Sequence, residues 1–227
     1  MKNFLLSIAI YLFFALKSFA HVEHYANYEY LEYELFRNNK SIGYHKFNFE
    51  REDGNLSVIS NVSFKISKLG VDLYNYFAKS EENYENSIFK SYSSTTKQNK
   101  KDRYVNITID PTDKNLLING SSYKGKASKE FIVGTWWNHE IVKAKAQISG
   151  ISGRIIEQTV TFIGKEEIKV GEKVYKTLHF NFKSSDETLP DSKKLNTDIW
   201  YEEKTNLWVK ASFDKSGHWE YRIKTIK

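Results

Sequence analysis

The residues of this chain best suited to chemistry are its six histidines, because the sequence contains no cysteine. A thiol nucleophile and a thiolate metal site are therefore excluded. The sequence also lacks a Gly-x-Ser-x-Gly elbow, a phosphate-binding glycine loop and a His-Glu-x-x-His motif. His45, His179 and His218 share no spacing that would bring them together. No catalytic residue and no cofactor are predicted, so an enzyme ranks behind the other classes of protein.

His21 and His24 are candidate metal ligands. If the chain begins at His21, that residue supplies both an imidazole and a free amino group, and His24 adds a second imidazole. Nitrogen ligands of this kind suit copper. The simpler interpretation is a polar chain end with two solvated histidines.

His139 is also a candidate, because it lies beside Glu140 in the stretch 134–142, which reads GTWWNHEIV. The pair would suit acid–base chemistry, but sequence neighbours rarely face one another, and a polar residue capping a short turn explains them more simply. Trp136 and Trp137 precede the pair. On a strand their rings would point to opposite faces, so the stretch is predicted to be an irregular crossover with one short helical turn.

Aromatic residues on a concave surface bind apolar ligands, and Trp136, Trp137 and His139 are therefore predicted to bind a ligand. Core packing is the alternative for both tryptophans. Gly134 and the glycines at 150 and 153 flank the segment, so it is a candidate lid over a binding site.

The elements that must position these residues follow an N-terminal segment of different composition. Lys2 precedes an apolar run over residues 4–16, and Ser18 and Ala20 are the small residues that a signal peptidase recognises. The run is too short to span a bilayer. Residues 1–20 are therefore predicted to be a secretory signal peptide in helical form, with an uncleaved anchor as the alternative. Export to the periplasm or beyond follows from that prediction.

Residues 21–227 are predicted to form a single domain. Removal of Lys2 and Lys17 lowers the formal net charge from +6 to +4, a mildly basic balance that does not indicate a nucleic-acid-binding groove. No later apolar run is long enough for a membrane helix, so an integral membrane protein is not expected after cleavage. The sequence leaves the oligomeric state open.

Apolar and polar residues alternate through most of the domain, as in half-buried strands. The clearest examples are residues 31–35, 56–66, 174–182 and 219–223, and Asp53-Gly54 is a strong hairpin signal. Residues 84–92 read as one further strand. The pattern predicts an all-β fold: one large, strongly bent antiparallel meander or near-closed barrel of about 10–12 strands, with the crossover in the middle.

An outer-membrane barrel is an alternative that the charge pattern disfavours. Such a barrel has an apolar exterior, with charges in the lumen and the loops. Here most strands carry Lys, Glu and Asn on one face and large apolar residues on the other. A soluble protein with a packed or ligand-filled interior fits this pattern better.

Several segments together resemble an uncharacterised family of exported proteobacterial proteins; they are residues 33–35, 42–47, 136–138, 198–201 and 207–210. The resemblance spans most of the mature chain. It implies a periplasmic β-rich domain of unknown function and carries over no catalytic residue. Bent sheets of this kind are also similar in outline to the half-barrel lipoprotein carriers of the periplasm, an analogy of shape alone.

Two functions are therefore compared. The first is a binding or carrier module that holds an apolar or amphiphilic molecule on its concave face. The second is a structural or interaction domain whose interior is packed and whose edges or loops meet a partner. A connected cavity lined by aromatic residues favours the first, and a filled core favours the second.

The first prediction concerns the N-terminus. We expect the mature protein to begin at His21, because the apolar run ends in a small-residue cleavage site. Mass spectrometry of the protein from the periplasmic fraction measures this directly. Recovery of the full-length chain from the membrane fraction would contradict it.

Overall fold

The computed structural model describes residues 24–227, and one fifteen-stranded sheet accounts for most of them. The predicted signal helix and His21 lie outside the described residues. The strands of the first half are β1 (Tyr30–Arg37), β2 (Lys40–Glu52), β3 (Asn55–Lys68), β4 (Val71–Glu85), β5 (Ile88–Gln98), β6 (Lys101–Ile109), β7 (Leu116–Gly120) and β8 (Lys124–Ala127).

The second half contains seven strands and two short 3-10 helices. They are β9 (Ile132–Val133), η2 (His139–Lys143), β10 (Ala146–Ile148), β11 (Ile155–Val170), β12 (Lys173–Ser184), η3 (Asp191–Lys193), β13 (Asn196–Glu202), β14 (Trp208–Asp214) and β15 (His218–Ile226). The strands run across the sheet in the order 8-7-6-5-4-3-2-1-15-14-13-12-11-10-9.

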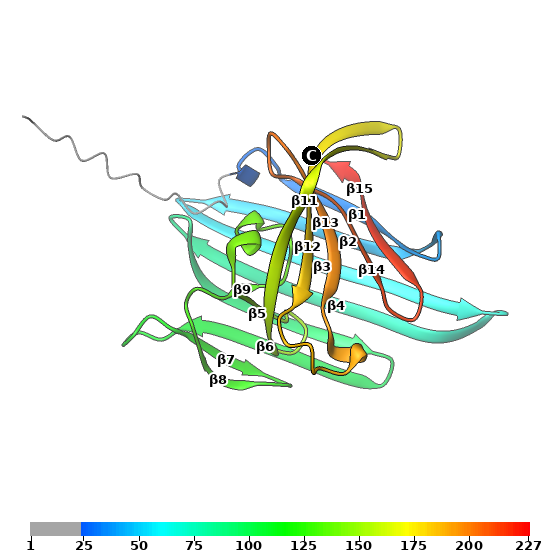
Figure 1. Ribbon diagram of the computed structural model, residues 1–227. Helices are drawn as coiled ribbons and strands as arrows, with labels where there is room; N and C mark the ends of the chain where they lie inside the picture. The colour runs from blue at the N-terminus through cyan, green and yellow to red at the C-terminus, as the bar shows by residue number, and fades with distance from the viewer. Residues whose placement is uncertain (1–23) are drawn as a thin grey trace, which may run out of the picture.

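The first and last strands pair with each other in the middle of the sheet. β1 and β15 are antiparallel, with Leu31 opposite Ile226 and Arg37 opposite Trp219. The strands of the first half run across the view in Figure 1, and β11–β13 run steeply relative to them, so the sheet is strongly bent. The two edge strands, β8 and β9, are consecutive along the chain.

The seam between the two edges is bridged by a loop. The carbonyl of Gly150, between β10 and β11, accepts hydrogen bonds from Tyr92 Oη at 3.0 Å and from Ser94 Oγ on β5. The Ser152 carbonyl accepts from the Ser122 amide at 2.9 Å, beyond β7. The sheet does not close into a barrel by strand pairing, and these loop contacts hold its two margins together.

The all-β prediction is confirmed in outline, and the strand count was too low. Three short strands, β8, β9 and β10, come from segments too short to show a period. β9 and β10 also pair in parallel, an exception to the predicted antiparallel arrangement. Residues 84–92 do not form one strand, because Asn86 and Ser87 adopt left-handed φ angles of 49° and 64° and turn the chain. Positive φ at two central residues is the geometry of a tight hairpin turn.

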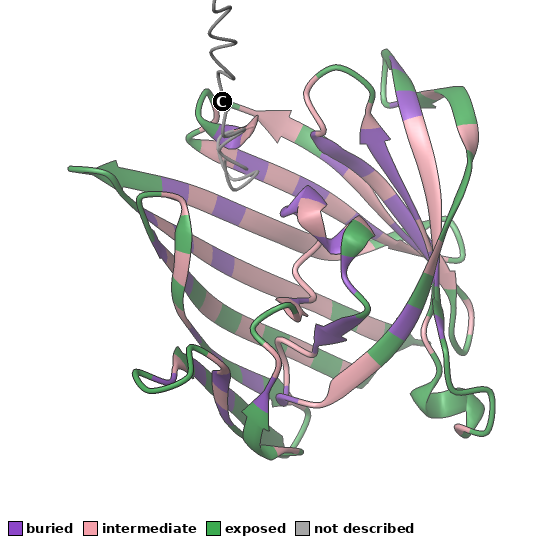
Figure 2. Ribbon diagram, turned by 60° about the vertical axis from the view of Figure 1, so that its left-hand side comes forward, coloured by how far each residue is buried: buried purple, intermediate pink, exposed green. Residues whose placement is uncertain are grey.

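The inner face of the sheet carries the main core. The largest fully buried side chains include Trp137, Trp208, Tyr25, Tyr33 and Phe47. Tyr33 Oη donates to the Trp208 carbonyl at 2.7 Å, and the Trp208 amide donates to Tyr25 Oη at 2.9 Å. Figure 2 shows the alternation of buried and exposed residues along the long strands, with the segment containing η2 on the inner side of the curved sheet.

The second prediction tests a close strand approach at Gly43. A Cβ atom at this position would lie 2.1 Å from the Ser63 carbonyl oxygen and 2.6 Å from Phe64 Cα on β3. We expect Gly43→Ala to lower the free energy of unfolding by about 1–3 kcal/mol, or several degrees in melting temperature. Thermal denaturation followed by circular dichroism measures the loss.

Gly164 on β11 provides the matched control, because a Cβ atom there meets nothing within 4 Å. Gly164→Ala should leave the melting temperature nearly unchanged. Equal melting temperatures for the two variants would contradict the close approach at Gly43.

Candidate binding site

The crossover between β9 and β10 runs through the interior of the bent sheet. The Gly134 amide donates to the Ile148 carbonyl at 2.9 Å, which ties the start of the crossover to β10. The predicted helical turn is present as η2. Asn138 caps it, since its Oδ1 accepts a hydrogen bond from the Glu140 amide at 3.0 Å.

The two tryptophans of the crossover point in different directions because Trp136 has a left-handed φ of 59°. The Trp136 ring packs edge-on against Trp208 and Tyr221, with centroids 5.5 and 5.6 Å away. The Trp137 ring packs against Phe49 and Tyr84 on the other side, at 5.5 and 5.9 Å. A bulky residue rarely adopts positive φ, so surrounding contacts must hold this conformation.

A buried carboxylate supplies the main polar contact of the crossover with the sheet. Glu82, on β4, is 2% exposed. It accepts hydrogen bonds from Trp137 Nε1 at 3.0 Å and from Thr135 Oγ1 at 3.3 Å. Tyr84 Oη also donates to it. On the C-terminal side, Tyr201 Oη donates to the Trp136 carbonyl at 2.9 Å.

The environment of Glu82 favours its neutral form. Burial raises the pKa of its carboxyl from 4.5 to about 6, and the hydrogen bonds from Tyr84, Trp137 and Thr135 oppose the rise. Charged Glu82 therefore carries a desolvation cost at neutral pH. The hydrogen bonds that the carboxylate accepts from Tyr84, Trp137 and Thr135 offset this cost, because the buried donors of Tyr84 and Trp137 would otherwise be unsatisfied.

A cavity of about 550 Å³ lies on the Trp136 side of the crossover. Apolar and aromatic groups from five strands and the crossover form much of its wall, among them Val62, Tyr76, Tyr92, Trp136, Phe213 and Tyr221. Its volume falls in the range of small-molecule sites, which are mostly apolar and hold a few placed polar groups.

His45 and Ser60 contribute a polar spot to the cavity wall. His45 Nε2 and Ser60 Oγ are 2.7 Å apart. Burial lowers the pKa of His45 to about 3, so its imidazole is neutral at physiological pH. Within the part of the chain that the structure describes, His45 Nδ1 and Trp136 Nε1 are buried without a hydrogen-bond partner. Both atoms belong to side chains of the cavity wall, and each is a buried polar atom whose hydrogen bond is unmade.

The three predicted ligand-binding residues occupy different environments. Trp136 lines the cavity, whereas Trp137 is 0% exposed and belongs to the packed core. His139 is also buried and packs against Tyr201, with ring centroids 4.8 Å apart. Of the three, the structure brings only Trp136 to this cavity.

The sequence reasoning missed the cavity-lining residues of the strands and the role of Glu82. Periodicity predicts Phe213 and Tyr221 only as inward-facing strand residues, and the adjacent carboxylates Glu81 and Glu82 read most simply as a solvated face. The alternation of apolar and polar residues along a strand shows which face is inward, but not which inward side chains are packed and which border a cavity. The sequence carries no signal for the burial of Glu82, which follows from the placement of β4 with Glu82 opposite Tyr92.

His24, one of the two predicted metal ligands, lies beside the loop between β13 and β14. His24 Nε2 lies 3.3 Å from Asn206 Nδ2. Among residues 24–227, no three His, Asp or Glu side chains are placed together to hold a metal ion. His21 falls outside this range, so its metal binding stays a prediction.

A separate histidine cluster lies on the outer face of β12 and β13. His179 Nδ1 is 2.8 Å from Glu166 and its Nε2 is 3.0 Å from Asp198. Its ring stacks on Trp200 at 4.3 Å, and Trp200 Nε1 donates to Glu166 at 2.6 Å. Both carboxylates are substantially exposed, so these contacts form a surface hydrogen-bond network that joins β11, β12 and β13.

The fold and cavity define an all-β protein with a strongly bent open sheet and a partly hollow interior. The chain belongs to the family described as a domain of unknown function, DUF6134, whose match spans residues 33–224. The predicted membership of an uncharacterised β-rich family is thereby confirmed. A search of curated proteins gives no match.

Among solved structures, a β-barrel-like protein of the domain of unknown function DUF1849 from Brucella abortus has a similar fold. The TM-score is 0.58 at 9% identity, over 87% of this chain and 96% of that one. A DUF1329 family protein from Desulfovibrio piger aligns with a TM-score of 0.19 at 11% identity, over 92% of this chain and 90% of that one. Within residues 24–227, none of the helices has the length and apolar character needed to cross a bilayer.

The third prediction concerns Glu82→Gln. Glutamine keeps an acceptor for Trp137 and removes the ionisation. Because the raised pKa favours the protonated form in the folded state, the wild type should gain stability relative to the variant as pH falls from above 6 to 4.5. The expected gain is about 2 kcal/mol, measured by urea unfolding across that range.

The lowered pKa of His45 has the opposite effect, because it reduces the free energy of unfolding as pH falls below 6.5. Both proteins share that contribution, so it cancels in the difference between them. Parallel stability curves for wild type and variant would show that Glu82 is not desolvated in the folded protein.

Proposed function

We propose that this protein is an exported binding or carrier module that holds an apolar or amphiphilic molecule in the cavity beside Trp136. The observation that carries the proposal is the cavity of about 550 Å³, whose wall includes five aromatic side chains: Tyr76, Tyr92, Trp136, Phe213 and Tyr221. This domain has no disulfide, so apolar burial is its main source of stability, and side chains that filled the cavity would raise its free energy of unfolding. An interior left open is therefore more consistent with ligand binding than with a purely structural role.

Export forms part of the proposal and rests on the sequence. The apolar run at residues 4–16 and the small residues at 18 and 20 support removal of a signal peptide. A carrier in an envelope compartment would need a site for apolar groups, because lipids and other amphiphiles are poorly soluble in the water between two membranes.

A partner-binding role is the second candidate, and one feature favours it. The hairpin between β3 and β4 exposes Leu69, Val71 and Leu73 by 95%, 61% and 55%. Figure 1 shows this hairpin projecting at the right of the molecule. Neighbouring exposed apolar side chains on a projecting tip are typical of a contact surface. This role is compatible with a ligand in the cavity.

The fourth prediction separates the two tryptophans. Trp136→Ala should weaken binding of a neutral apolar dye, N-phenyl-1-naphthylamine, several-fold, because Trp136 lines the cavity. Trp137→Ala should instead lower the free energy of unfolding by about 3–5 kcal/mol, because that ring is fully buried in the core. Dye titration and urea unfolding of both variants measure these effects.

Each variant serves as the control for the other, since both remove one indole. Dye binding that is absent from the wild type, or unchanged in Trp136→Ala, would contradict ligand binding at this cavity. Native mass spectrometry of the protein from its own host would then show whether any molecule is retained elsewhere.

A further inference from the structure

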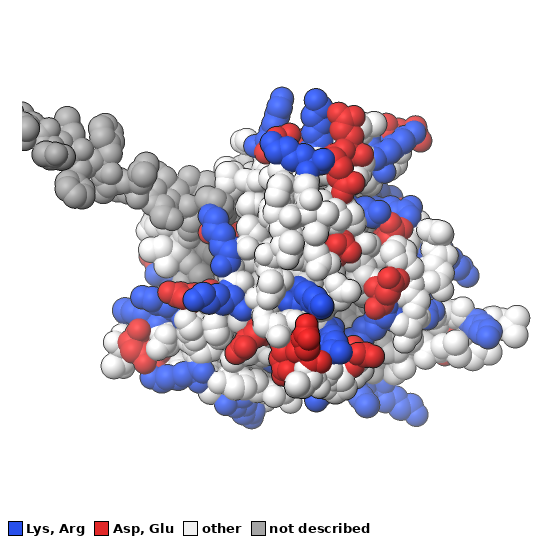
Figure 3. Space-filling model, viewed as in Figure 1, with Lys and Arg blue, Asp and Glu red and all other residues white. Residues whose placement is uncertain are grey.

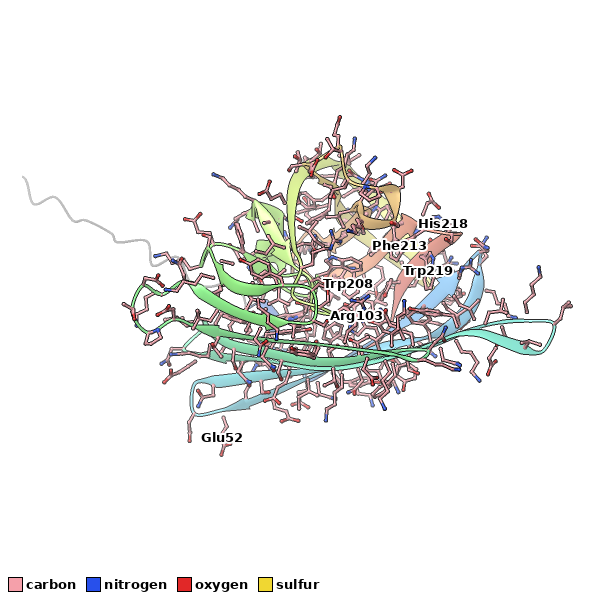
Figure 4. The ribbon with its side chains drawn as sticks, turned by 90° about the horizontal axis from the view of Figure 1, so that it is seen from below. Glu52, Arg103, Trp208, Phe213, His218 and Trp219 are labelled. Carbon is pink, nitrogen blue, oxygen red and sulfur yellow. The ribbon has the colours of Figure 1, made fainter. Side chains whose placement is uncertain are left out.

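The charged residues that line the cavity come from three loops at its rim. Arg154 follows the β10–β11 loop, Asp191 and Lys194 belong to the loop around η3, and Asp214 and Lys215 border the β14–β15 turn. Lys215 Nζ donates to the Ser192 carbonyl at 2.7 Å, which joins the last two loops. Figure 4 places Phe213, His218 and Trp219 together at one end of the molecule, far from Glu52 at the other.

The two carboxylates of the rim are already engaged with other partners. Asp191 pairs with Lys194 at 2.9 Å, and Asp214 pairs with His218 at 3.0 Å. Among residues 24–227, neither Arg154 nor Lys215 has a carboxylate within 4.0 Å. On the face seen in Figure 3, by contrast, positive and negative side chains are interspersed. The rim therefore carries three cations and two carboxylates, an excess of one positive charge, and neither Arg154 nor Lys215 is in direct contact with a carboxylate of residues 24–227.

The surroundings of these two cations disfavour their charge. Burial lowers the pKa of the Arg154 guanidinium. Burial also lowers the pKa of Lys215, and the charge of Arg154 lowers it further, so the two groups lie close enough to repel. An anion between them would offset both the desolvation and the repulsion. Arg154 is well suited to it, because guanidinium pairs with carboxylate or phosphate through two parallel hydrogen bonds.

Beyond these charged residues the wall is uncharged, and it combines aromatic and aliphatic side chains with hydroxyl and amide groups. Phe213 precedes the β14–β15 turn and lies 6.5 Å from Trp136 between ring centroids, and Tyr221 lies 5.6 Å from Trp136. A ligand with its head at the rim therefore places the rest of its length along these rings. The shape selects a molecule that is charged at one end and apolar at the other.

We propose that the cavity binds an amphiphile with an anionic head, a carboxylate or phosphate held by Arg154 and Lys215, and an apolar tail along Trp136, Phe213 and Tyr221. This inference rests on the proposed binding function and adds the charge and orientation of the ligand. The Arg154 guanidinium would form two parallel hydrogen bonds with the anionic head, and the Lys215 ammonium would add positive charge beside it.

Three amphiphiles with the same twelve-carbon tail test the sign of the head: dodecanoate, dodecanol and dodecyltrimethylammonium. Each displaces N-phenyl-1-naphthylamine from the wild-type protein at concentrations below micelle formation. Dodecanoate should bind about tenfold or more tightly than dodecanol, as expected for a charge-assisted pair, and the cation should bind most weakly.

The double variant Arg154→Gln/Lys215→Gln should lose that tenfold preference for dodecanoate and keep its affinity for dodecanol. Arg103→Gln/Lys100→Gln is the matched control, because it removes the same two residue types from a separate surface hollow. The control should bind all three amphiphiles as the wild type does.

Equal affinities of the wild type for the three heads would overturn the anionic-head proposal and leave apolar binding intact. Failure of the dye and of all three amphiphiles to bind would instead overturn the proposed function itself. If the double variant is unfolded by circular dichroism, the wild-type series alone decides. An equal loss of preference in the control would assign the effect to overall charge and contradict a site at Arg154.

Discussion

The pairing of β1 with β15 is the constraint on which the rest of the structure depends. Because the first and last strands meet in the middle of the sheet, each half of the chain must extend outward from that pair, and the middle of the chain arrives at both margins. The edge strands β8 and β9 then come from adjacent segments. β9 and β10 pair in parallel, so a tight hairpin cannot join them, and the crossover that connects them passes inside the curve of the sheet.

The two tryptophans of the crossover face different parts of that interior. On one side, the fully buried Trp137 indole donates a hydrogen bond to the buried carboxylate of Glu82. On the Trp136 side, the left-handed backbone turns the ring toward β14 and β15, and the cavity remains. The desolvation of Glu82 is the cost of satisfying donors on a segment with no strand neighbour. The cavity beside Trp136 and the left-handed backbone of Trp136 therefore both arise in the crossover.

Local patterning was a reliable guide to the elements and a poor one to the site. Alternation identified β1, β3, β12 and β15, because a strand with one buried face shows period two whatever its partners. It failed for β9 and β10, which are too short to show a period. The irregular conformation of the tandem tryptophans was predicted correctly. Their separation into one core residue and one cavity residue was not, because it depends on φ at Trp136.

The sequence by itself determined the all-β class, the single bent sheet and the irregular crossover with its helical turn, since these follow from periodicity and turn residues within short windows. Its motifs also indicated the β-rich family. Only the tertiary structure decided the central β1–β15 pairing, the open seam, the burial of Glu82 and the meeting of Arg154 with Lys215 at one rim. Each of these joins residues dozens of positions apart or more. A strand's own pattern says which face is buried, but not which distant strand or loop lies against it.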